Sequence, residues 1–72
     1  MSDIKRSVRI AGHRTSVTLE PEFWDALKDI AREAGLSLNA LIARIDAERL
    51  PATANLSRAV RLYVLQHYKK RG

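Results

Sequence analysis

The sequence contains no cysteine, two prolines and three glycines in 72 residues, and aromatic residues make up 6% of it. Without cysteine the chain has neither a disulfide framework nor a thiolate metal site. No apolar run approaches the roughly 20 residues that span a bilayer. No continuous apolar segment follows the cations near the N-terminus, so a secretory signal is not indicated. We therefore expect a cytoplasmic protein with no membrane partner.

The length excludes a two-domain enzyme, a Rossmann unit and a barrel. The apolar content of 46% is too high for a disordered tail. One small domain remains, and a domain of this size buries little surface by itself. Small domains without disulfides or metals often rely on a second subunit, so a homo-oligomer is the first expectation.

Positive charge is concentrated at both ends of the chain, which has 13 Lys and Arg against 8 Asp and Glu, a formal net charge of +5. Residues 1–19 carry four cationic side chains and one acidic one, and residues 49–72 carry six cationic side chains and no acidic one. Residues 20–48 are acidic overall. Such clustering is typical of proteins that bind a polyanion such as nucleic acid. The alternative is a solvated surface with a basic tail.

The alternation of polar and apolar residues over 13–19 predicts a short, half-exposed strand. Its outward side chains would be Arg14, Ser16 and Thr18. Pro21 follows directly and marks the start of a helix over residues 21–34, because proline suits the first helical position. Gly35 is suited to end that helix.

Two more helices are expected after this turn. Ser37 can cap a helix over residues 38–50, which Pro51 ends. A C-terminal helix over 55–70 follows, capped by Asn55 or Ser57. Residues 1–12 form a basic N-terminal arm, in which 7–11 also alternate and could add a short second strand. The predicted fold class is mostly α with one short β-strand.

A single strand of seven residues cannot satisfy its own backbone groups and needs a ladder partner. Residues 7–11 could fold back on it, but one intervening glycine, Gly12, makes a very tight hairpin. The other source is the same strand of a second chain, paired antiparallel around a two-fold axis. This arrangement gives an intertwined homodimer with a two-stranded ribbon. Such a ribbon fits the DNA major groove, where arginine can bond guanine through two hydrogen bonds.

The order of these elements resembles the ribbon-helix-helix family of bacterial transcription factors, of the Arc and MetJ type. The residues that carry the resemblance are the strand Arg14–Leu19, the start Glu20-Pro21-Glu22, the stripe Phe23, Leu27, Ile30 and Ala31, and the turn Gly35–Asn39. It covers residues 13–50. From Lys5 to Ser57 the chain is similar to a group of short, mostly uncharacterised bacterial proteins of this class. The third helix departs from the founding members, whose second helix usually ends the fold.

The resemblance implies roles for individual residues. Base contacts are implied for Arg14, Ser16 and Thr18. Phosphate contacts are implied for Ser37 and Asn39, in agreement with the unsatisfied N–H groups of a helix N-terminus. Further phosphate contacts are expected beside the ribbon, from His13, Arg9, Lys5 and Arg6, with a solvated histidine and a frayed arm as the alternatives. The expected dimer core comprises Val17, Leu19, Phe23, Leu27, Ile30, Leu38, Leu41, Ile42 and Ile45.

The leading interpretation is a sequence-specific DNA-binding protein, a transcriptional repressor that acts as a homodimer or as a dimer of dimers on double-stranded DNA. One alternative is an antitoxin-like module that binds a partner protein through the C-terminal helix, where Leu62 and Leu65 lie off the apolar stripe. Another places that basic helix on anionic lipid. No catalytic residue, metal or cofactor is expected, because acidic pairs such as Asp25 and Asp29 lie on a predicted solvated face.

Overall fold

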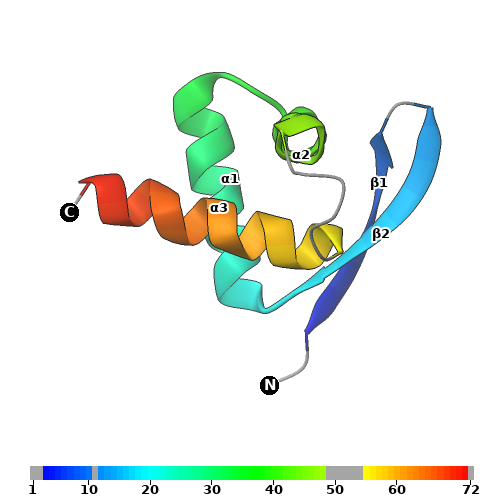
Figure 1. Ribbon diagram of the computed structural model, residues 1–72, viewed down its shortest axis with the longest axis horizontal. Helices are drawn as coiled ribbons and strands as arrows, with labels where there is room; N and C mark the ends of the chain where they lie inside the picture. Colours follow the sequence, from blue (N-terminus) through cyan, green and yellow to red (C-terminus); the bar gives the residue numbers. More distant parts are fainter. Residues whose placement is uncertain (1–2, 11, 49–54, 72) are drawn as a thin grey trace.

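The computed structural model describes residues 3–10, 12–48 and 55–71, and it shows a two-stranded antiparallel sheet followed by three helices (Figure 1). The strands are β1 (Ile4–Ile10) and β2 (His13–Leu19), and the helices are α1 (Pro21–Ala34), α2 (Leu38–Glu48) and α3 (Leu56–Arg71). The prediction of a ribbon-helix-helix arrangement with an additional C-terminal helix is confirmed. The predicted end of the second helix at residues 49–50, and Pro51 after it, lie outside the described residues.

The ladder partner of β2 is β1 of the same chain, which corrects the predicted pairing with a second chain. Ile4 lies opposite Leu19, and Ile10 lies opposite His13. Because β1 ends at Ile10, two residues connect the strands instead of one. Gly12 has a φ of 82°, a left-handed value that suits a two-residue hairpin connection. The sequence interpretation started the second strand too late, at residue 7, and therefore judged the hairpin too tight.

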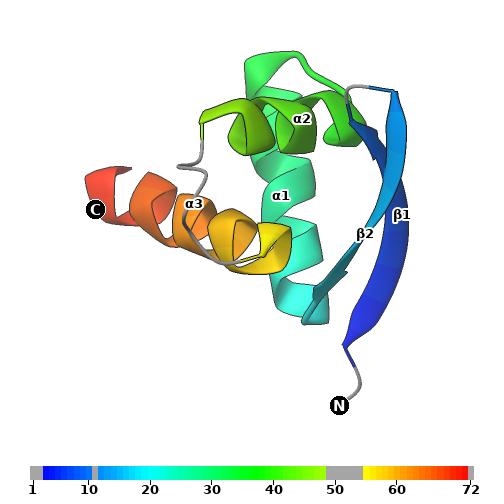
Figure 2. The ribbon, with the colours of Figure 1, turned by 45° about the vertical axis from the view of Figure 1, so that its right-hand side comes forward.

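The two faces of the hairpin have different surroundings, and the helices lie on one side of it (Figure 2). On that side Val8, Val17 and Leu19 are buried. The opposite face, which we call the open face, is defined by six side chains that alternate with the buried ones: Lys5, Ser7, Arg9, Arg14, Ser16 and Thr18. The hairpin therefore has the alternation of a sheet with one packed and one free face.

One hydrophobic core joins the hairpin to all three helices within a single chain. Its buried members are Val8, Val17, Leu19, Trp24, Leu27, Ile30, Ala31, Leu41, Ile42, Ile45, Leu56, Val60 and Val64. Seven of the nine side chains expected in a dimer core are among them, and Phe23 and Leu38 are partly buried at its margin. Their burial needs no second chain, and an additional role between chains stays a prediction.

Local signals position the helix ends. At the end of α1, Gly35 adopts a left-handed φ of 72°, and the next N–H, of Leu36, donates to the carbonyl oxygen of Ala31 at 2.9 Å. Ser37 Oγ accepts the N–H of Ala40 at 3.0 Å and so caps α2. Asn55 Oδ1 accepts the N–H of Arg58 at 3.0 Å and caps α3, which leaves Ser57 free for another contact.

The helix α3 packs against the core through one face and leaves another face uncovered. Leu56, Val60 and Val64 are buried, whereas Leu62 and Leu65 keep 42% and 54% of their surface exposed. Its C-terminal turns point away from the hairpin (Figure 1). Among the described residues, no helix is long and apolar enough to cross a membrane, and no cluster of acidic and histidine side chains could hold a metal ion.

Candidate nucleic-acid interface

The open face carries three cross-strand pairs of side chains. Lys5 lies opposite Thr18, Ser7 opposite Ser16, and Arg9 opposite Arg14. None of the six side chains is acidic, and within the described chain none of the three cations has a carboxylate partner. Like charges directly opposite each other destabilise a strand pair. The Arg9–Arg14 pair therefore concentrates uncompensated positive charge at one end of the open face.

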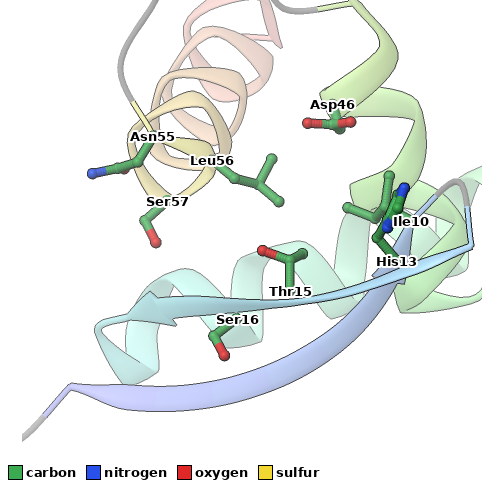
Figure 3. A pocket seen from close by; sticks show the side chains of 8 residues that line it. All are labelled: Ile10, His13, Thr15, Ser16, Asp46, Asn55, Leu56 and Ser57. Carbon is green, nitrogen blue, oxygen red and sulfur yellow. The ribbon is translucent and has the colours of Figure 1, made fainter.

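The close-up in Figure 3 shows how β2 separates the two faces. Thr15 points towards the helices, into a hollow of about 430 Å³, whereas Ser16 points away from it. The hollow is lined by Ile10, His13, Thr15, Ser16, Asp46, Asn55, Leu56 and Ser57. The side chain of Ser16 thus belongs to the open face, together with Arg14 and Thr18, as the alternation in the sequence predicts.

The outer edge of β1 is closed at one end by Asn39, in the first turn of α2. Its side-chain Oδ1 accepts the backbone N–H of Arg9 at 2.9 Å, and its Nδ2 donates to the carbonyl oxygen of Arg9 at 2.8 Å. The amide thus makes the pair of hydrogen bonds that a neighbouring strand would make. Asn39 thereby positions Arg9, and through the register Arg14, relative to α2. The phosphate contact expected of Asn39 stays a prediction.

Replacing Asn39 with alanine should free this end of the hairpin. Two hydrogen bonds of a partly solvated group are lost, so we expect a loss of about 1–2 kcal/mol in the free energy of unfolding. The amide proton of Arg9 should exchange faster with solvent. Asn39→Asp, which keeps the acceptor and loses the donor, should give an intermediate exchange rate. Unchanged protection of Arg9 in the alanine variant would show that the amide does not hold the strand.

An open hollow of about 420 Å³ lies beside this contact, lined by Ser7, Val8, Arg9, Arg14 and Asn39. The hollow therefore borders both the paired arginines and the first turn of α2. A helix N-terminus carries about half a positive charge and attracts anions. The hydroxyl of Ser37 accepts one hydrogen bond as a cap and can still donate one to a bound group.

The outer edge of β2 is closed at the opposite end of the hairpin by α3. The backbone N–H of Thr18 donates to Ser57 Oγ at 3.0 Å, and Arg61 Nη2 donates to the carbonyl oxygen of Thr18 at 3.4 Å. The guanidinium of Arg61 also donates through Nε to Glu20 Oε1 at 3.0 Å. Each free edge of the hairpin is therefore flanked by the first turns of a helix, α2 beside Arg9 and α3 beside Thr18.

The carboxylate of Glu20 makes the stability of the fold depend on pH. The hydrogen bond from its own backbone N–H, and then the one from Arg61, lower the pKa of Glu20 below its ordinary value. Its carboxylate therefore stabilises the fold above the unfolded-state pKa, and this contribution is lost as the pH falls through the lower, folded-state pKa. Glu20→Gln should melt below the wild type at about pH 7, and the difference should shrink towards about pH 3.

Thermal unfolding followed by circular dichroism at both pH values measures this difference. Glu22→Gln removes a carboxylate from the same end of α1 without touching Arg61 and serves as the control. A difference between Glu20→Gln and the wild type that stays constant from neutral to acidic pH would contradict the assigned role of the ion pair.

The structure separates the cations that the sequence grouped into one arm. Lys5 and Arg9 lie on the open face, whereas Arg6 lies on the other face, with its guanidinium 5.4 Å from the centre of the Trp24 ring. His13 is exposed where β2 begins. Sequence reasoning missed Ser7, although the alternation of Lys5, Ser7 and Arg9 with apolar residues could have identified it. The DNA contacts assigned to all these residues stay predictions.

Comparison with known proteins agrees with the fold described above. Residues 3–68 match the model of a family described as a ribbon-helix-helix domain. A solved structure of an uncharacterized protein from Bordetella pertussis Tohama I is similar, with 35% sequence identity and a TM-score of 0.82 over 94% of this chain. The match covers 57% of that protein's chain. No curated protein is significantly similar. The chain belongs to the ribbon-helix-helix domain family.

Proposed function

We propose that the protein is a sequence-specific DNA-binding regulator, a transcriptional repressor, and that it inserts the β1–β2 hairpin into the major groove with the open face towards the bases. The observation that carries the proposal is the Arg9–Arg14 pair on a face without acidic residues. Two strands lie about 4.8 Å apart, and the major groove is about 12 Å wide and admits such a ribbon. Arginine side chains entering it can bond guanine O6 and N7.

Phosphate contacts would come from the two helix ends that flank the hairpin. The first turn of α2 lies beside Arg9, and the first turn of α3 lies beside Thr18. A hairpin in the groove would therefore have a helix N-terminus near the backbone on each side. Arg58, exposed in the first turn of α3, adds a cation there. Such contacts fix depth and register, while the open face supplies specificity.

The hairpin of one chain is complete, so this proposal does not need two chains to form the ribbon. In a homodimer, or in a dimer of dimers on DNA, each chain would place its own hairpin in a separate segment of the groove. Two such segments would read two half-sites of one operator. A regulator of this kind works in the cytoplasm, where bacterial DNA is accessible.

Selection of sheared genomic DNA on the purified protein, followed by sequencing, tests the proposal. We expect the wild type to enrich a short sequence and Arg14→Ala to lose that enrichment. Arg32→Ala removes the same charge from the exposed face of α1, outside the hairpin, and should select the same sequence as the wild type. Recovery of all sequences equally, or of none, would contradict sequence-specific regulation.

A second candidate function is supported by the uncovered face of α3, where Leu62, Leu65 and Tyr68 are exposed. An apolar face on a helix without acidic residues suits an antitoxin that binds an acidic partner protein. In this case deletion of the gene should harm the host. Leu62→Ser/Leu65→Ser should fail to rescue growth while Arg14→Ala rescues it. Rescue by both variants would count against this candidate.

A further inference from the structure

The hairpin has an asymmetry that a ribbon made from two copies of one strand cannot have. One end of the open face carries Arg9 opposite Arg14, and the other end carries Lys5 opposite Thr18. In a ribbon with a two-fold axis the two ends would be identical. Here the two ends differ in charge and in hydrogen-bonding groups, so the open face has two chemically distinct ends.

The free edges of the hairpin also leave little room for a strand of a second chain. On β1 the N–H and C=O groups of Arg9 are bonded by Asn39. On β2 the same groups of Thr18 are bonded by Ser57 and Arg61. A strand added along either edge would have to displace one of these contacts. The two strands of the ribbon thus come from one chain, and each outer edge of the ribbon is occupied at one residue by a contact from a helix.

We propose that each chain carries a whole DNA-reading ribbon, and that Lys5, Ser7 and Arg9 of β1 read bases together with Arg14, Ser16 and Thr18 of β2. This inference rests on the proposed function. Successive rows of side chains on one face are about 6.6 Å apart, so three rows span about 13 Å, or about four base pairs at roughly 3.4 Å each. One hairpin then recognises a directional sequence of about this length, with guanine preferred at the arginine end.

The topology can be tested with introduced thiols, because the chain has no cysteine of its own. Ser7 lies opposite Ser16, and the outward N–H groups of Arg9 and Thr18 show that this pair belongs to the non-hydrogen-bonded type. The Cα atoms of such a pair are about 4.5 Å apart, within the range of a disulfide. Oxidised Ser7→Cys/Ser16→Cys should therefore lose both thiols and remain a single chain on a non-reducing gel.

Ser16→Cys alone separates the two possible ribbons. Ser16 is the central residue of β2, so two β2 strands paired around a two-fold axis would bring the two thiols together and link the chains. We expect disulfide-linked dimers to form no faster than in Arg32→Cys, which has an exposed thiol on α1 and measures collisions. Rapid dimer formation by Ser16→Cys would overturn the proposal.

The reading role is tested on the DNA sequence that the wild type selects. Oxidised Ser7→Cys/Ser16→Cys should bind it within about tenfold of its reduced form, since the disulfide only locks the existing hairpin. Arg9→Ala and Arg14→Ala should each weaken base preference at the same end of the site by about 5- to 150-fold. Lys5→Ala should act at the other end.

The outcomes keep this inference apart from the proposed function. If Arg14→Ala alters base preference and Arg9→Ala does not, the protein is a sequence-specific DNA-binding protein but β1 does not read bases, and the inference is wrong. If the wild type selects no sequence, the proposed function is wrong and the reading role of β1 falls with it. In that case the thiol experiments still determine whether the ribbon belongs to one chain.

Discussion

Replacing Trp24 with alanine should lower the melting temperature by roughly 12 to 40 °C. The side chain is 2% exposed in the core, and removal of a buried Trp costs about 3–5 kcal/mol. For a domain of this size, each kcal/mol corresponds to roughly 4–8 °C. Total stability at about 0.05–0.15 kcal/mol per residue is about 4–11 kcal/mol for 72 residues, so the loss removes a large share of it. The Trp24→Ala protein should therefore be only marginally stable at ambient temperature if the wild type lies at the lower end of this range.

The effect is large because Trp24 connects α1 to β1. Its ring packs in the core from α1, and its Nε1 donates to the carbonyl oxygen of Ile4 at 2.9 Å, which ties down the start of β1. Arg6 lies over the same ring. Far-ultraviolet circular dichroism during heating measures the change. Trp24→Phe should lower the melting temperature by less than Trp24→Ala. Leu65→Ala should leave it nearly unchanged, because Leu65 is exposed. A Trp24→Ala protein that melts within a few degrees of the wild type would contradict the structural role assigned to Trp24.

Arg14→Ala should weaken binding to the selected DNA sequence by about 5- to 150-fold, equivalent to about 1–3 kcal/mol for a lost base contact. Binding to unrelated DNA should change much less. Because a base contact releases few counterions, the slope of log affinity against log salt concentration should stay nearly constant. The physical reason is the position of Arg14 on the open face, without a carboxylate partner among the described residues.

Arg58→Ala is the matched comparison, because it removes a cation from the first turn of α3 and not from the open face. It should weaken binding to all sequences alike and reduce the salt slope by about 1, as expected for a phosphate contact. Titrations by fluorescence anisotropy at several salt concentrations, with specific and unrelated duplexes, separate the two effects. Equal losses on both duplexes for Arg14→Ala would indicate that Arg14 contacts phosphate and not bases.

The helices and β2 were predictable because their signals are local. Pro21 and Gly35 bound α1, and both positions have backbone requirements that the residue type itself satisfies. Ser37 likewise caps α2 through a contact three residues away. The bounds of β2 follow from strict alternation over 13–19. These elements depend on neighbouring residues, which a single sequence displays directly.

The hairpin was not predicted because its signal is interrupted at Arg6. The apolar positions Ile4, Val8 and Ile10 alternate with polar ones, but Arg6 occupies the core-side position between Ile4 and Val8. That cation is accommodated by the ring of Trp24, which is 18 residues away in the sequence. The roles of Asn39 and Arg61 have the same origin, since their partners Arg9 and Glu20 are 30 and 41 residues distant. Contacts of this kind exist only after folding.

The amide of Asn39 has a consequence for the protein at high concentration. An exposed strand edge is a template on which other chains can add strands, and such addition leads to aggregation. Asn39 occupies the edge of β1 at Arg9, while α3 occupies the edge of β2 at Thr18. With one contact at each end, neither edge offers a full length for a foreign strand. The two edges are thus protected against strand addition, while the open face stays uncovered by the helices.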